Sequence, residues 1–288
     1  MPAQFVSKHR SPKFGQTERS MHNVPRKVTV SIVLSLNLMH LGVGFAQGPK
    51  LDVPYVPTEM PVVNAILRMA NVSKDDFLID LGSGDGRIPI AAAKLHGTRG
   101  LGVDLDPRRV AEARRAAQVR QVADKVDFRQ EDVFDTDISK ATVITMYLLP
   151  DVNFRLRPRL LLEPRPGTRI VSHEFDLGDW KPDGTLKIKS STLYLWIVPA
   201  QVEGRWQLAD PGLDEKEPVT INIMQRFQHI AGIAKVRGRS VPLRRAELEA
   251  DRIKFELPVG EGRSNRYDGR IIDDRLVGEN WSASRTEQ

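Results

Sequence analysis

The stretch "LIDLGSGDGRIPIAAAK", residues 78–94, decides the fold of this chain. It joins a short apolar run to a helix-like run through three glycines, Gly82, Gly84 and Gly86. Glycines let the backbone turn sharply and approach a ligand where any Cβ would clash. In open parallel sheets, ligands bind beyond the carboxyl ends of the strands, near the switch in strand order. The stretch therefore predicts a strand, a ligand-binding loop and a helix.

Strand-like and helix-like segments alternate on both sides of this loop. Short buried strands are predicted within 75–82, 100–106, 126–134, 141–150 and 168–175. Helices are predicted within 58–72, 87–97, 107–122 and 151–162, and a hairpin within 185–200. Such regular alternation indicates a parallel sheet with helices on both faces. We expect an α/β, doubly wound domain over residues 47–200.

The character of the sequence changes after residue 200. Short alternating segments, separated by Gly, Pro and Asp, fill residues 201–288. This pattern is typical of an antiparallel β-domain, either a small barrel or a sandwich. One run, "PVGEGRSNR" at 258–266, is predicted to be a loop. The chain should thus carry a small antiparallel β domain behind the α/β domain.

The N-terminal segment, residues 1–46, has the pattern of a leader. Two cations, Arg26 and Lys27, precede an apolar stretch, and Gly44 and Ala46 occupy the −3 and −1 positions of a small-residue cleavage site. We expect a signal peptide, with an uncleaved membrane anchor as the alternative. The protein would then be exported, periplasmic or membrane-anchored, touching the membrane only through an uncleaved leader; the alternative location is cytoplasmic.

Charge and composition exclude several classes of protein. The net charge is +6, but residues 1–46 hold six basic residues and one acidic residue, so the remainder is nearly neutral. A nucleic-acid partner is therefore not expected, because such binding needs a basic surface. The chain has no cysteine, which excludes disulfides, thiolate metal sites and cysteine nucleophiles. No metal site is predicted.

The spacing of the glycines excludes two phosphate-binding motifs. A dinucleotide fingerprint, G-x-G-x-x-G, requires a third glycine at position 87, where this chain has Arg87. The G-K-[ST] end of a P-loop is also absent. A nicotinamide-dependent oxidoreductase is therefore disfavoured.

Four carboxylates around the loop indicate a different ligand. Asp80 ends the first strand and Asp85 lies in the loop, where they would repel a pyrophosphate but suit an ammonium group. Asp104 ends the second strand, where it can accept bonds from both ribose hydroxyls, and Asp132 follows the third, within reach of an adenine amino group. The pattern predicts S-adenosylmethionine. The alternatives are a buried structural role for Asp80, a helix cap for Asp104 and a solvated acid at Asp132.

At these motifs the chain resembles the class I methyltransferases, which have a Rossmann-like fold. "DLGSGDGR", "GVDLDP" and "QEDVF" match their cofactor motifs. "VPYVPT", "YLLP" and "GTRIVSHEFDLGDWKPD" resemble the lysine methyltransferases that act on the c-subunit of ATP synthase and on the adenine nucleotide translocase, and their archaeal relatives. The resemblance covers residues 51–200. It implies methyl transfer from S-adenosylmethionine to a protein partner with an accessible lysine.

The resemblance also suggests roles for three further residues. Tyr147, in "MYLLP", follows the fourth strand, where these enzymes place groups that line the methyl acceptor; the alternative is a packing aromatic. Tyr55 and Thr58 lie in a stretch similar to the cofactor lid, although Thr58 is equally suited to cap the helix that follows. Tyr147 is our candidate catalytic residue, and Tyr55 and Thr58 are candidates for binding the cofactor.

Two functions remain open at this point. The first is a methyltransferase that acts on a protein lysine by in-line displacement, which needs alignment and a neutral amine but no covalent nucleophile. The second is an exported, non-catalytic binding protein that keeps the fold, because a charged sulfonium made in the cytosol does not cross membranes unaided. The glycine loop, Asp104 and Asp132 follow one another in the order and spacing of a cofactor site, which favours the enzyme.

Overall fold

The computed structural model describes residues 55–213, 218–260 and 262–286. The expected leader, residues 1–46, lies outside these described residues. Within them, no helix is both long enough and apolar enough to cross a membrane.

Seven of the described strands form a mixed sheet in the order β3-β2-β1-β4-β5-β7-β6. They are β1 (Phe77–Leu81), β2 (Arg99–Asp104), β3 (Val126–Gln130), β4 (Val143–Met146), β5 (Arg169–His173), β6 (Gly184–Ile188) and β7 (Ser191–Ile197). The first five run parallel, and β7 is antiparallel to both β5 and β6. The strand order reverses between β1 and β4. The expected doubly wound sheet with a terminal hairpin is confirmed.

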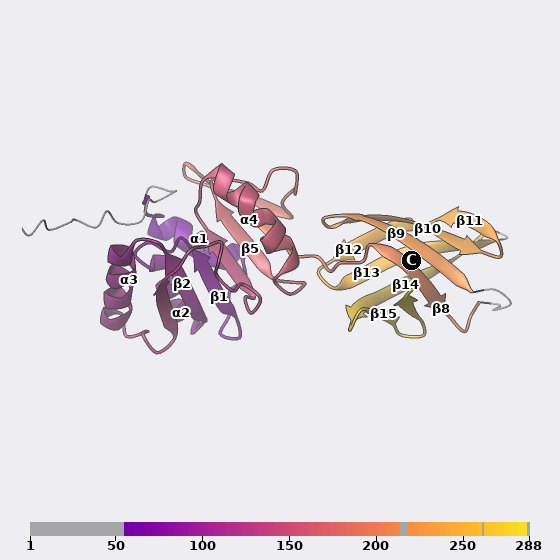
Figure 1. Cartoon of the computed structure of the whole chain (residues 1–288), viewed down its shortest axis with the longest axis horizontal. Coiled ribbons are helices and arrows are strands. Elements are labelled where there is room, and N and C mark those ends of the chain that lie inside the picture. The colour runs from indigo at the N-terminus through magenta and orange to yellow at the C-terminus, as the bar shows by residue number, and fades with distance from the viewer. Residues whose placement is uncertain (1–54, 214–217, 261, 287–288) are drawn as a thin grey trace, which may run out of the picture. The chain divides into compact units, whose positions relative to one another are not determined.

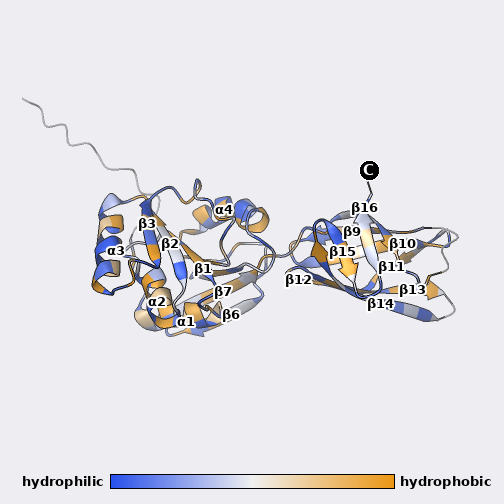
Figure 2. Ribbon diagram, turned by 90° about the horizontal axis from the view of Figure 1, so that it is seen from below, coloured by the Kyte–Doolittle hydropathy of each residue, from blue (hydrophilic) through white to orange (hydrophobic). Residues whose placement is uncertain are grey.

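Four described helices cover the two faces of this sheet: α1 (Met60–Met69), α2 (Arg87–His96), α3 (Pro107–Val119) and α4 (Pro150–Leu162). Figure 2 shows α4 on one side of the sheet and α1 and α2 on the other. On the α4 side, Leu156 and Leu160 pack with Ile79 of β1; on the other side, α1 and α2 enclose Leu78. Successive residues of a strand point to opposite faces, and both faces of β1 are covered. Its residues are therefore apolar on both faces, with Asp80 as the exception.

The loop between β1 and α2 is tied to the end of β2. The N–H groups of Gly82 and Ser83 both donate to the carbonyl oxygen of Val103, at 3.0 and 2.8 Å. Gly86 then begins α2 in the left-handed conformation, with φ +76°. A Cβ at this position would lie 2.6 Å from the Phe128 ring and 2.8 Å from Ala113 Cβ. Gly86 therefore allows α2 to pack closely against α3 and β3.

We expect Gly86→Ala to lower the free energy of unfolding by about 2 kcal/mol, because it adds both left-handed strain and overpacking. Gly97→Ala is the matched control: Gly97 also has a positive φ, +73°, but the nearest atom to an added Cβ is 3.8 Å away. Urea denaturation of both variants measures the difference. Equal losses would show that the contact with Phe128 is unimportant.

The structure shows which residues cap the N-terminal ends of α1 and α3. Thr58 does not cap α1: the N-cap is Glu59, without a side-chain hydrogen bond, and the Thr58 hydroxyl instead contacts His173. Asp106 caps α3, accepting from the Arg108 N–H at 2.9 Å. Asp104, two residues earlier, is therefore not needed as the cap of α3.

A second sheet is formed by nine described strands, in the order β11-β10-β9-β8-β16-β15-β14-β13-β12 (Figure 1). They are β8 (Gly204–Ala209), β9 (Val219–Arg226), β10 (His229–Val236), β11 (Arg239–Pro242), β12 (Arg244–Glu249), β13 (Arg252–Gly260), β14 (Arg263–Ile272), β15 (Arg275–Gly278) and β16 (Ser282–Arg285). All neighbours are antiparallel.

This second sheet curls toward a barrel. The two edge strands, β11 and β12, are separated in the chain by a single residue, Leu243, so the two ends of the sheet meet there. Trp206, Phe255 and Tyr267 are buried in its core. The expected antiparallel β domain is confirmed, whereas the loop predicted at 258–266 is wrong, because β13 and β14 continue through most of it.

The turn between β9 and β10 contacts the segment that joins β5 to β6, within the compact unit Gln47–Gln288. The Phe227 ring stacks on Trp180, with centroids 5.8 Å apart and planes at 9°. Arg226 pairs with Asp179 at 2.9 Å, and Gln228 donates to the carbonyl oxygen of Lys181 at 2.9 Å. The turn therefore braces the segment between β5 and β6.

Candidate functional site

A cavity opens at the carboxyl ends of β1, β2, β3 and β4, beside the point where the strand order reverses. All the predicted site residues except Gly86 line it: Tyr55, Thr58, Asp80, Gly82, Gly84, Asp104, Asp132 and Tyr147. Residues far apart in the sequence thus meet at one place. Gly86 lies outside the lining and serves the packing of α2.

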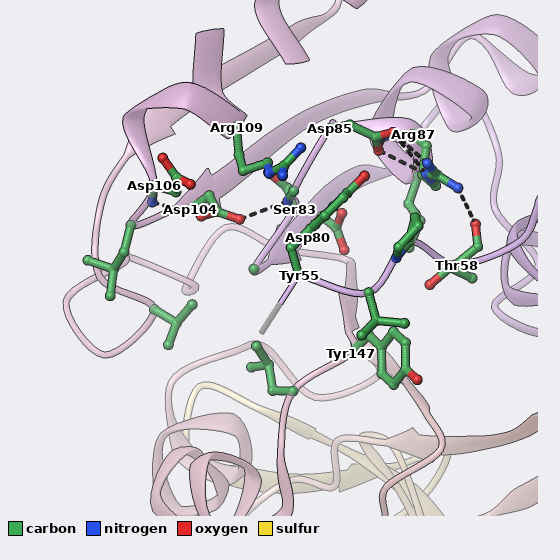
Figure 3. A pocket seen from close by; sticks show the side chains of 18 of the residues that line it. Tyr55, Thr58, Asp80, Ser83, Asp85, Arg87, Asp104, Asp106, Arg109 and Tyr147 are labelled. Atoms are coloured by element: carbon green, nitrogen blue, oxygen red, sulfur yellow. Dashed lines mark hydrogen bonds and ion pairs between the residues drawn. The ribbon is translucent and has the colours of Figure 1, made fainter. Parts of the chain in front are cut away.

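Asp104 ties the glycine loop to the second strand. Its Oδ2 accepts from the Gly84 N–H and its Oδ1 from the Asp106 N–H, both at 2.9 Å (Figure 3). A carboxylate oxygen has two lone pairs, so each oxygen can still accept a bond from a ligand. Asp104 is therefore held in a fixed orientation with capacity for two ligand hydroxyls.

Asp80 is a buried carboxyl group in the wall of the cavity. The Thr145 hydroxyl donates to its Oδ1 at 2.6 Å. Burial raises the pKa of Asp80 to about 7, with the charges of Asp104 and Asp85 adding to the effect, although the Thr145 bond lowers it. Asp80 is consequently poised between its neutral and charged forms near neutral pH.

Asp85 has a cationic partner within the chain. Its carboxylate binds Arg87 through both oxygens, and Arg87 also donates to the carbonyl oxygen of Thr58 at 2.7 Å (Figure 3). Burial raises the pKa of Asp85, but the hydrogen bonds and charge of Arg87 outweigh it, so the pKa lies below its usual range. Asp85 therefore fixes Arg87, and Arg87 holds the segment before α1.

The side chain of Tyr55 covers the glycine loop. A Cβ on Gly84 would lie 2.6 Å from Cε2 of the Tyr55 ring, and the Arg109 guanidinium sits 3.8 Å from the centroid of the same ring. Burial and the charge of Asp85 raise the pKa of Tyr55. Only a glycine at position 84 lets Tyr55 approach the loop this closely.

Two further contacts hold the segment Tyr55–Glu59 in place. The Thr58 hydroxyl lies 3.1 Å from His173 Nδ1, and Glu59 pairs with Lys189 at 2.5 Å. Together with the bond from Arg87, these contacts fasten the segment to α2, β5 and the β6–β7 turn. This is the arrangement expected of a lid over the cavity.

Asp132 lies in an apolar part of the cavity. Its Oδ1 accepts from the Phe134 N–H at 2.9 Å, which fixes the turn after β3. Leu105, Val133 and Phe134 line the wall beside it. Apolar walls with one oriented polar group suit a flat heteroaromatic ring with an amino edge.

Tyr147 lines the cavity at the end of β4 and continues into an aromatic cluster. Its ring is 4.0 Å from that of His173 and 6.3 Å from that of Phe175. Burial and the charge of Glu174 raise the pKa of Tyr147, so the phenol stays protonated at neutral pH. His173, which its place at a strand end suggests as a base, already bonds through both ring nitrogens, to Thr58 and Ser191.

Comparison with known proteins identifies the family of this chain. A family model described as the ANTKMT methyltransferase domain matches residues 80–184. The protein-lysine N-methyltransferase of Saccharolobus islandicus (strain REY15A) is 42% identical over 151 residues, which are 51% of this chain and 94% of that protein. This chain belongs to that lysine methyltransferase family.

Two other proteins are similar to this lysine methyltransferase chain. Their names give two different methyl acceptors, a protein and RNA. The adenine nucleotide translocase lysine N-methyltransferase of Mus musculus is 29% identical over 182 residues, which are 63% of this chain and 78% of that protein. A crystal structure described as an RNA methyltransferase from Salinibacter ruber, in complex with S-adenosyl-L-homocysteine, is 52% identical with a TM-score of 0.50, over 51% of this chain and 96% of that one. The fold, the enzyme class and the cofactor S-adenosylmethionine are confirmed.

Proposed function

We propose that the chain transfers a methyl group from S-adenosylmethionine to the side-chain amine of a protein lysine. The observation that carries this proposal is the similarity to the protein-lysine N-methyltransferase of Saccharolobus islandicus, which extends over 94% of that protein. S-adenosylmethionine supplies an electrophilic methyl on a sulfonium, and an amine attacks it in line. The chain has to align the amine, exclude water and accept the amine in its neutral form.

The residues present fit this cofactor. Asp104 would accept the two ribose hydroxyls, and Asp132 would accept the adenine amino group while the apolar wall packs on the ring. Asp80, buried beside the glycine loop, would take the ammonium of the methionine end, and Gly82 and Gly84 would bring the backbone close to it. Tyr55 and Thr58 would close the cavity over the ligand.

We expect the affinity for S-adenosylmethionine to rise with pH between about 6 and 7.5. Below its pKa of about 7, Asp80 holds a proton, which a bound ammonium must displace. Binding then releases a proton, so affinity is roughly five- to tenfold weaker at pH 6 than at pH 7.5. Isothermal titration at several pH values measures this.

Asp80→Asn is the control for this titration, since it keeps the shape and cannot ionise. Its weaker binding should not vary over the same pH range. A flat profile in the wild-type protein would mean that Asp80 is only a structural partner of Thr145.

The test of the acceptor compares protein and RNA directly. The full chain is incubated with methyl-labelled S-adenosylmethionine and a cell extract, and the label is followed after protease or ribonuclease treatment. We expect label that only protease releases, and a mass increase of one or more methyl groups on lysine. Label that only ribonuclease releases would overturn the lysine acceptor and favour the RNA acceptor named for the Salinibacter ruber protein.

We further propose that residues 1–46 direct the protein to export or to the membrane, on the pattern of their sequence alone. Cell fractionation and N-terminal sequencing test this: a mature protein that begins at Gln47 supports cleavage, and full-length cytoplasmic protein contradicts it. Cofactor binding without turnover on any acceptor would support the alternative, an exported binding protein.

A further inference from the structure

A cluster of side chains lies next to the cavity, at the carboxyl end of β5. It consists of His173, Glu174 and Phe175, and it meets the cavity at Tyr147. The Tyr147 ring lies 4.0 Å from His173 and is stacked 6.3 Å from Phe175. Tyr147 lines the cavity and also contacts this cluster, so a group bound to the cluster would lie beside the cofactor cavity.

Glu174 has an unusual backbone conformation for its residue type. Its φ is +68°, in the left-handed region that favours glycine. The turn is made by the main chain: the Glu174 N–H donates to the carbonyl oxygen of Thr192 at 2.8 Å. A glycine would adopt this turn without the strain that a side chain carries in the left-handed region. The turn alone therefore does not explain a glutamate here.

The Glu174 carboxylate is not committed to another group in the described residues. His173 Nε2 is 3.4 Å away, but it already bonds Ser191 Oγ at 2.9 Å, while Nδ1 faces Thr58. Burial lowers the pKa of His173 more than Glu174 raises it, so the ring is neutral at pH 7. Among the described residues, no lysine or arginine pairs with Glu174, whose side chain is 29% exposed.

We propose that Glu174, with the rings of Tyr147 and Phe175, forms the site where the acceptor amine first binds in its protonated form. The bound ammonium must then give a proton to solvent water before its nitrogen can attack the methyl group. The inference rests on the proposed function, because it requires the acceptor to be an alkylamine. A half-buried carboxylate attracts an alkylammonium strongly, and aromatic rings add a cation–π contribution. A hydroxyl or a neutral nucleobase carries no positive charge, so it gains neither the attraction of the carboxylate nor the cation–π contribution. Glu174 thus selects a cationic acceptor and places it beside Tyr147.

The test measures binding apart from turnover. The full-length protein, saturated with S-adenosyl-L-homocysteine, is titrated with n-butylammonium, a probe of the lysine side chain, and the probe is observed by NMR. We expect Glu174→Gln to bind it about tenfold more weakly, Glu174→Asp to retain most of the affinity, and n-butanol to bind all three equally poorly. Equal affinity of wild type and Glu174→Gln for n-butylammonium overturns the inference.

Glu174→Gly separates the carboxylate from the turn. We expect this variant to melt at a higher temperature, because the strain is relieved, and yet to bind n-butylammonium about tenfold more weakly. A glycine variant that binds as the wild type does would show that Glu174 only shapes the turn. Methyl transfer to the cell extract is measured in parallel: a wild type that binds the probe but labels only RNA overturns the proposed lysine acceptor, not the cationic site.

Discussion

We expect Asp104→Ala to weaken S-adenosylmethionine binding by about 100-fold or more. Each hydrogen bond from a ligand hydroxyl to a fixed carboxylate contributes about 1.5–3 kcal/mol, and in the proposed complex Asp104 would offer one oxygen to each ribose hydroxyl. The variant also frees the Gly84 N–H, which Asp104 holds at 2.9 Å, so the glycine loop loses an anchor. Isothermal titration on the folded variant measures the loss.

Asp106→Ala is the matched control. Asp106 is two residues away and also lines the cavity, but its carboxylate caps α3 through the Arg108 N–H. Loss of a helix cap costs about 1 kcal/mol of stability. This variant should therefore melt earlier and bind the cofactor nearly normally. If both variants bound equally well, the ribose role of Asp104 would be wrong.

The fold could be predicted where local pattern and burial agree. The apolar run Leu78–Leu81, the glycines after it and Asp104 at the next strand end are all local signals, and the sheet is built around them. In the second sheet the pattern predicts the antiparallel strands but fails at one place. The residues of β14 at Arg263–Arg266 are polar and their sequence predicts a loop, yet they pair with β13 through the main chain, which carries no signature in the side chains.

The site was predictable in its carboxylates but not in the contacts that hold them. Asp80, Asp104 and Asp132 follow from their places after successive strands. The contact of Thr58 with His173 joins residues 115 positions apart, and only the folded chain shows that it replaces the expected helix cap. The pairing of Arg87 with Asp85 likewise appears only in the folded chain, where Asp85 still lines the cavity.

The largest effect on turnover should come from Tyr147. We expect Tyr147→Phe to lower kcat about 10- to 100-fold and to leave the Kd of S-adenosylmethionine within about twofold. Burial raises the pKa of this phenol, so we expect it to act as a neutral hydrogen-bonding group that orients the amine, not as a base. The loss should therefore be the same from pH 7 to pH 9, and Tyr147→Ala should lose more because the ring also walls the cavity.

Tyr194→Phe provides the matched control for this loss. Tyr194 lies on β7 against Trp196, with ring centroids 6.0 Å apart, and it does not line the cavity. Removing its hydroxyl should leave kcat unchanged. Suppose that Tyr147→Phe also kept its full kcat while Tyr147→Ala lost activity. The ring of Tyr147 would then matter only for packing, and the amine would be aligned by Glu174 and the aromatic ring of Phe175.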